Sequence, residues 1–409
     1  MKPIEFHFDF PERSIWKEKI IKELKENSDK IIYKNEIEGI SIDITEKPSH
    51  SFEVDDNRKS NDWKNCFYTD VENEKTTNSL CLKALMSGAD SLFLNIENDN
   101  LDWNLLTDNI EFDYISTRIK FSSKEGINSY LKFKNHNPNI EILIDPLTFQ
   151  EELIEYNFGF LLNGSELQQI GANTWQEAGI LLSTFHELLI QDKNRNTFNV
   201  HLGIGSNYFI EIAKIRAVKW LFNHLCSVYN VDETKIIFTA ESSFLNKSLK
   251  DPNTNLLRQS TEGMAALTSG VSELTIRPFD EISDAGSTDF SRRMALNISN
   301  ILKEESYFDF VKDPLKGSNI VELLSEEIIE KSWDFFKSLE SFKALKSADK
   351  INHITEEIEK SRNKRVALFQ ENEIKLIGIN SFLNIETNSN QWSNKSYIDV
   401  PYLILEKHL

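Results

Sequence analysis

The alternation of short aliphatic runs with amphipathic stretches constrains the fold of this chain more than any other feature. Between residues 78 and 305, β-branched or aliphatic runs are separated by stretches whose apolar residues recur at helical spacing. The aliphatic runs span residues 91–96, 114–121, 140–144, 158–162, 200–204, 235–238 and 273–276, and the clearest helical stretches span 174–191, 208–229, 256–268 and 289–305. This order predicts parallel βαβ units in an α/β protein.

Seven or eight such units close most economically into a (β/α)8 barrel, which we expect over residues 61–318. A doubly wound open sheet is the alternative that the same pattern allows. The barrel is the fold that we predict.

Two regions flank the predicted barrel. Residues 1–60 read as an N-terminal arm, with an apolar helical stripe (Ile15, Trp16, Ile20, Ile21 and Leu24), a strand-like alternation at 40–44 and a mostly polar stretch after it. Residues 319–409 read as a C-terminal helical extension that ends in a terminal strand, for which we select residues 374–379. The arm must bury its stripe somewhere, either on this barrel or on a partner.

Charge and cysteine content restrict the partners and the compartment. The chain has 46 Lys and Arg against 65 Asp and Glu, so its net charge of −19 is unsuited to nucleic acid. Its three cysteines are Cys66, Cys81 and Cys226, which are too far apart for a CxxC pair and too few for a disulfide framework. The N-terminus is acidic, and no window holds 18 consecutive apolar residues. We expect a cytoplasmic protein that binds neither membranes nor nucleic acid.

Standard catalytic motifs are missing from the sequence, which has no Walker loop, no nucleophile elbow and no HExxH zinc motif. His186-Glu187 begins the zinc motif, but Ile190 ends it, so a place on a helix surface is favoured over a metal ligand. Gly203-Ile-Gly205 fits a tight turn better than a phosphate cradle. His201 opens a predicted strand, which places it near the non-catalytic rim of a barrel. We therefore predict no metal site and no catalytic residue from these patterns.

Several motifs between residues 171 and 380 occur in an order that is typical of one enzyme family. Residues 251–258 read Asp-Pro-Asn-Thr-Asn-Leu-Leu-Arg, and residues 262–266 read Glu-Gly-Met-Ala-Ala. Further similar segments lie at 171–177, 209–217, 279–281, 288–293, 313–318 and 377–380. In this order the motifs resemble the methylmalonyl-CoA mutase family. The resemblance implies a (β/α)8 barrel related to enzymes that interconvert methylmalonyl-CoA and succinyl-CoA by a radical route started from adenosylcobalamin.

The chain departs from the catalytic members of that family at the pocket positions. Counting back without gaps from Asp251, the family's substrate-contacting His falls on Thr239, its Gln on Glu241 and its Gly on Phe244. Thr cannot carry charge at neutral pH, and Phe fills space that a ligand would need. The family's cobalt-ligating D-x-H-x-x-G motif also has no counterpart, since the nearest segment reads Asn199-Val-His201.

These departures resemble the small subunit of the heterodimeric mutases. The resemblance implies that this chain alone is inactive, binds no cofactor and supports a large catalytic subunit that supplies adenosylcobalamin to the holoenzyme. The isolated chain could then form a homodimer. We interpret the motifs that resemble the family as structural and not as ligand contacts. They provide a turn and cap at Asp251, polar contacts at Arg258 and Asp289, and close helix packing at Met264. The alternatives are an active acyl-CoA mutase barrel whose cobalamin domain is a separate chain, and a stand-alone barrel of unrelated function.

Overall fold

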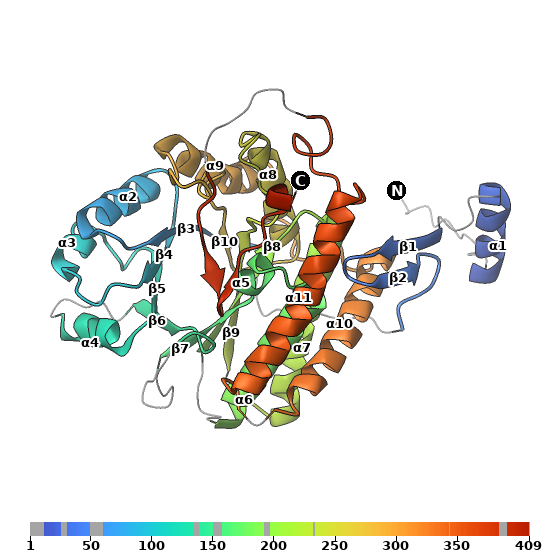
Figure 1. Cartoon of the computed structure of the whole chain (residues 1–409), viewed down its shortest axis with the longest axis horizontal. Helices are drawn as coiled ribbons and strands as arrows, with labels where there is room; N and C mark the ends of the chain where they lie inside the picture. Colours follow the sequence, from blue (N-terminus) through green and yellow to red (C-terminus); the bar gives the residue numbers. More distant parts are fainter. Residues whose placement is uncertain are drawn as a thin grey trace, which may run out of the picture.

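The barrel predicted from the alternating pattern is confirmed in a computed structural model of the chain (Figure 1). The structure describes residues 12–25, 31–49, 60–133, 139–149, 158–191, 197–231, 234–342, 344–383 and 391–408. All neighbouring barrel strands are parallel, and β10 pairs with both β3 and β9, which closes the sheet. The strands are β3 (Lys64–Asp70), β4 (Ser91–Ile96), β5 (Ser116–Phe121), β6 (Ile140–Ile144), β7 (Gly159–Asn163), β8 (Thr197–Ile204), β9 (Lys235–Ser242) and β10 (Glu273–Thr275).

Helices follow most strands and cover the outside of the barrel (Figure 1). They are α2 (Glu74–Met86), α3 (Trp103–Thr107), α4 (Lys124–Lys132), α5 (Gly164–Gln169), α6 (Thr174–Gln191), α7 (Tyr208–Tyr229), α8 (Thr254–Thr268) and α9 (Asp289–Glu304). The start of α7 is set by Asn207, whose side chain accepts a hydrogen bond from the Ile210 amide, and its end by Asn230 in the left-handed region at φ 53°. These caps match the bounds predicted from the apolar periodicity.

The largest hydrophobic core lies between α6, α7 and the strands beneath them. Phe185 stacks on Phe222 with ring centroids 4.7 Å apart and meets Phe198 of β8 edge-on at 4.8 Å. All three side chains are fully buried. This side of the barrel is therefore tightly packed against α6 and α7.

The N-terminal arm lies beyond one side of the barrel (Figure 1). It comprises α1 (Arg13–Leu24) and an antiparallel hairpin of β1 (Ile32–Asn35) and β2 (Ile40–Asp43). Arg13 donates to the Thr45 carbonyl at 2.7 Å, and Lys17 pairs with Asp43 at 2.5 Å, but α1 buries no residue. Its apolar stripe is therefore largely open to solvent.

The C-terminal region adds the long helices α10 (Asn319–Leu339) and α11 (Ala348–Gln370), and α10 packs against α6 and α7. The strand predicted at 374–379 is wrong: Ile377 makes only an isolated bridge to Ser381, and Gly378 at φ +82° turns the chain. Two short strands, β11 (Ser396–Tyr397) and β12 (Val400–Pro401), and a 3-10 turn (Leu405–His408) come later. Within the described ranges, no helix combines the length and the apolar character needed to cross a membrane.

Candidate functional site

A buried polar group fills the inside of the barrel, and we call it the axial cluster. Its members come from β5, β8, β9 and β10 and the residues just after β10: Arg118, Asn199, His201, Thr239, Glu241, Glu273 and Arg277. Residues two apart on one strand point to the same side, so 199 with 201 and 239 with 241 can both face the barrel interior. The cluster is therefore a consequence of strand alternation in a closed sheet.

The first charge pair of the axial cluster is Arg118 with Glu273. Arg118 also donates to the Asn199 side-chain oxygen at 3.1 Å, and its guanidinium lies 4.6 Å from the ring centroid of Phe93. Glu273 accepts a hydrogen bond from the Ser91 hydroxyl at 2.6 Å. These groups, with Leu143 and Leu161 beside Phe93, occupy the barrel axis.

The second charge pair is Glu241 with Arg277, at 2.9 Å. Burial alone would raise the pKa of Glu241, but Arg277 and hydrogen bonds from His201 and Ser165 outweigh it and hold that pKa well below its ordinary value. Burial lowers the pKa of His201. Glu241 is therefore an anion whose charge is compensated by Arg277, and His201 is a neutral ring at pH 7.

The prediction that His201 lies near the N-terminal rim is wrong. The strand begins four residues earlier, at Thr197, which places His201 in the middle of β8 and inside the barrel. Its Nδ1 lies 2.8 Å from the Thr239 hydroxyl, and its Nε2 lies 3.5 Å from a Glu241 oxygen. The polar residues at the start of β8 concealed the true start of the strand.

Phe244 lies just beyond β9, at the mouth formed by the carboxyl ends of the strands. It is buried with Leu249, Ile282 and Ile404. The guanidinium of Arg277 lies 5.1 Å from its ring centroid and 3.8 Å from that of Tyr68. His201 contacts Thr239 and Glu241, and Arg277 contacts Glu241 and Phe244, so the three predicted positions belong to one connected group of side chains.

The family-like motifs outside the barrel axis make structural contacts. Arg258 donates to Asn255 at 2.9 Å and to the Ile377 carbonyl, while Asp251 accepts from the Thr254 hydroxyl. Asp289 pairs with Lys83 at 2.8 Å, which joins the start of α9 to α2.

Two other motif positions also pack within the fold. Met264 is partly buried against the main core. His186 lies 2.6 Å from Glu340 and 2.5 Å from the Tyr229 hydroxyl, so it joins three helices.

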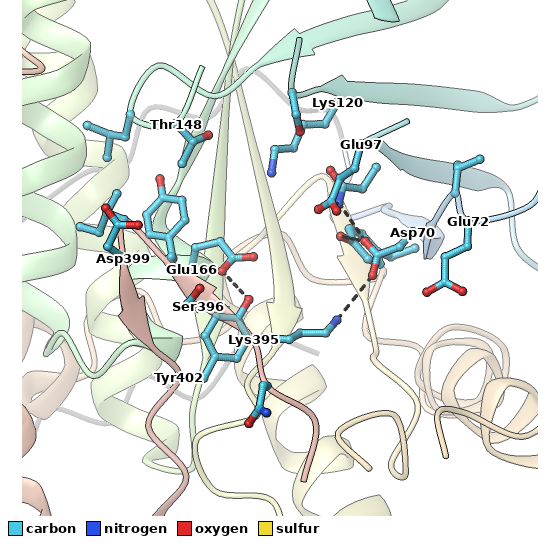
Figure 2. A pocket seen from close by; sticks show the side chains of 18 of the residues that line it. Asp70, Glu72, Glu97, Lys120, Thr148, Glu166, Lys395, Ser396, Asp399 and Tyr402 are labelled. Carbon is cyan, nitrogen blue, oxygen red and sulfur yellow. Dashed lines mark hydrogen bonds and ion pairs between the residues drawn. The ribbon is translucent and has the colours of Figure 1, made fainter. Parts of the chain in front are cut away.

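A cavity of about 690 Å³ opens above the axial cluster, at the carboxyl ends of β3 to β7. Figure 2 shows it, and we call it the mouth cavity. Its charged lining residues are Asp70, Glu72, Glu97, Lys120, Glu166, Lys395 and Asp399. Active sites of (β/α)8 enzymes lie at this end of the barrel. Five carboxylates against two lysines make the cavity strongly acidic.

The C-terminal strap, residues 394–402, forms one wall of the mouth cavity. The Tyr397 hydroxyl donates to Asp145 at 3.1 Å, and that of Tyr402 donates to Glu166 (Figure 2). Lys395 reaches Asp70 at 3.5 Å. No local sequence pattern predicts these contacts, since they join the strap to residues more than 200 positions away.

Among the described residues, no histidine lines the mouth cavity, and His201, inside the barrel, is enclosed by Thr239 and Glu241. Across the described ranges, no three His, Cys, Asp or Glu side chains are placed to hold a metal ion.

Comparison with known proteins identifies the family. The methylmalonyl-CoA mutase family model matches residues 135–400. The methylmalonyl-CoA mutase small subunit of Porphyromonas gingivalis is 36% identical over 235 residues, covering 54% of this chain and 38% of that protein. The small subunit of Streptomyces virginiae is 34% identical over 182 residues (42% and 29%), and the methylmalonyl-CoA mutase of Rhizobium meliloti is 28% identical over 257 residues (60% and 36%).

These matches reach well under half the length of each relative, at 38%, 29% and 36%. The two small subunits are more similar to this chain in sequence than the Rhizobium protein is. Together with the closed barrel, the family match places the chain: it belongs to the methylmalonyl-CoA mutase family.

Proposed function

We propose that the chain is the small, non-catalytic subunit of a heterodimeric, adenosylcobalamin-dependent methylmalonyl-CoA mutase of the cytoplasm. In this proposal it binds a large catalytic subunit and does not itself bind acyl-CoA. The filled barrel axis is the observation that carries the proposal.

An acyl-CoA threaded through this barrel would have to displace the axial cluster. Arg118 with Glu273 and Arg277 with Glu241 are two ion pairs buried inside the barrel. Separating the partners of a buried pair leaves an uncompensated charge, which costs about 3–5 kcal/mol for each pair. Phe244 adds a buried ring at the mouth. The gain from threading a flexible chain would have to exceed these costs.

The charge of the mouth cavity points in the same direction. Its lining carries five carboxylates and two lysines, and the phosphates of coenzyme A are anions. Like charges repel strongly where water is partly excluded. The cavity is therefore poorly suited to the phosphate end of an acyl-CoA.

The exposed apolar stripe of α1 supports the proposal that the chain binds a partner subunit. Ile15 is 57% exposed and Trp16 is 43% exposed, although both are large apolar side chains. Burial of such a side chain contributes about 1.5–3 kcal/mol. A second protein surface would gain this energy by covering α1.

Co-expression with the large subunit from the same organism tests the proposal. An affinity tag on this chain should retain the large subunit. Size-exclusion chromatography with light scattering should then give the mass of a one-to-one complex. Mutase activity should require the large subunit, and the isolated chain with adenosylcobalamin and methylmalonyl-CoA should give no succinyl-CoA. Turnover by the isolated chain, or by this chain with a separate cobalamin-binding protein, would instead establish the active-barrel alternative.

A further inference from the structure

A second cavity lies away from the mouth, where three distant parts of the chain meet. It has a volume of about 210 Å³ and is more enclosed than the mouth cavity. Its charged lining residues are Glu38 from the turn between β1 and β2, Glu211 from α7 and Arg365 from α11. We call it the side cavity. Neither the axial cluster nor the C-terminal strap contributes to it.

Arg365 supplies a cation whose hydrogen-bonding capacity is not used within the described residues. Its guanidinium has no hydrogen bond or ion pair there, and its Nε is buried without a partner. The charges that act on it are those of Glu38 and Glu211. An arginine keeps its charge and offers five N–H donors in a planar fork that fits a carboxylate. Arg365 is therefore suited to hold a carboxylate inside the side cavity.

The two carboxylates supply the opposite charge. One oxygen of Glu38 accepts from the Thr174 amide at 2.9 Å and from its hydroxyl at 2.6 Å. Glu211 accepts from the Gln168 side-chain nitrogen at 3.3 Å and pairs with Lys214 at 2.8 Å. Lys214 also pairs with Glu177 at 2.9 Å, so the surroundings hold three carboxylates and two cations, Lys214 and Arg365. A ligand that carries one charge of each sign would leave that balance unchanged.

The loop Gly203-Ile-Gly205 explains how these polar groups come close together. A Cβ at Gly205 would lie 2.8 Å from a Glu211 oxygen, so a larger residue there would require the Glu211 carboxylate to move. With a carboxylate packed against it, the loop cannot cradle a phosphate. The turn that the sequence predicts there therefore serves to shape the side cavity.

We propose that the side cavity binds a small zwitterion, namely an α-amino acid with a compact aliphatic side chain. Its carboxylate would meet Arg365, and its ammonium group would meet Glu38 and Glu211. Apolar side chains line part of the cavity (Ile37, Ala172, Ile210, Leu245, Ile374, Leu376 and Leu405), where the aliphatic side chain would lie, and uncharged polar residues line another part (Asn35, Gln168, Thr174, Ser206, Asn207 and Asn246). The volume equals that of roughly seven waters at about 30 Å³ each, which suits a molecule of similar size. This proposal is independent of the large subunit.

Binding of L-valine to the full chain, followed by isothermal titration calorimetry, tests the proposal. Isovalerate keeps the carboxylate without the ammonium group, and isobutylamine keeps the ammonium group without the carboxylate. L-valine should bind saturably and at least about tenfold more tightly than either fragment. A folded protein that shows no saturable binding of L-valine would mean a cavity that holds water only, which overturns the proposal. If isovalerate bound as tightly as L-valine, the ammonium group would not be recognised, which would overturn the proposal that the ligand is a zwitterion.

Two variants locate the binding site. Arg365→Met should weaken L-valine binding at least about tenfold, whereas Lys364→Met removes a cation from the neighbouring position of the same helix and should leave binding unchanged. Ala172→Leu fills the cavity without removing a charge and should abolish binding, which provides a second test should Arg365→Met not fold. Circular dichroism checks the fold of each variant. Unaltered L-valine binding by either folded variant would place the ligand elsewhere.

Discussion

Glu241 and Arg277 form an ion pair inside the barrel, with Oε2 and Nη1 2.9 Å apart and exposed side-chain fractions of only 6% and 5%. Arg277 also donates to Glu281 from its Nε at 3.0 Å and lies over the rings of Tyr68 and Phe244. One guanidinium thus joins the barrel interior to its mouth. The pair holds charged groups in the space that a threaded substrate would need.

Replacement of Arg277 by Met should strongly destabilise the protein. The variant leaves Glu241 buried without its cation, and loss of one partner of a buried pair costs about 3–5 kcal/mol. Lys337→Met is the matched control, because it removes one partner of the Lys337–Asp334 pair, which is 58% and 75% exposed. Urea unfolding followed by circular dichroism measures both. Equal, small losses of unfolding free energy would show that the axial pair is not a tight structural contact.

The stability contributed by Glu241 should depend on pH. Its pKa in the folded protein lies below the ordinary value of 4.5, because Arg277, His201 and Ser165 outweigh the opposing effect of burial. A lowered carboxyl pKa contributes stability that is present above 4.5 and is lost as the pH falls towards the folded-state value, since the unfolded chain takes up the proton first.

Glu241→Gln removes this titration. The difference in unfolding free energy between the native protein and the variant should therefore shrink from about pH 6 to about pH 3. Glu305→Gln changes an exposed carboxylate outside the barrel and serves as the control variant. A Glu241→Gln difference that does not change with pH would contradict the lowered pKa.

The sequence predicted the elements whose signal is local. Helices α6 and α7 have the predicted bounds because each carries a continuous apolar stripe, and strands β4 and β6 have theirs because each is a short run rich in aliphatic residues. Strand β3 was not among the predicted strands, since Lys64–Asp70 is mostly polar and aromatic and has Thr69 as its one β-branched residue. In the structure, β3 is held in the barrel by pairing with β10 on one side and with β4 on the other.

The axial cluster and the mouth cavity were not predictable in the same way. Arg118 and Glu273 are 155 positions apart, and they meet only because the sheet closes on itself. Thr239, Glu241 and Phe244 were selected by counting along a family motif, which gave their positions but not the network around them. Long-range contacts of this kind leave no periodic signal in one sequence.

The C-terminal strap should loosen when its two tyrosine hydroxyls are removed. Hydrogen bonds to charged groups contribute about 1.5–3 kcal/mol, and the double variant Tyr397→Phe, Tyr402→Phe loses those to Asp145 and Glu166 while keeping both rings. Hydrogen exchange of the amides in residues 394–402 should become faster by about tenfold or more. Tyr114→Phe is the control, because Tyr114 is 84% exposed. Unchanged exchange in the double variant would show that backbone pairing alone holds the strap.

The α1 stripe should be needed for the large subunit and not for folding. Ile15 and Trp16 are exposed, and α1 buries no residue, so the double variant Ile15→Glu, Trp16→Glu should keep the unfolding midpoint of the native chain. Lys19→Glu changes the net charge by the same amount on the same helix and serves as the control. In size-exclusion chromatography with the large subunit, the double variant should elute separately while the control stays in the complex. A double variant that stays in the complex would place the interface elsewhere, and one that unfolds would show that the stripe is buried within this chain.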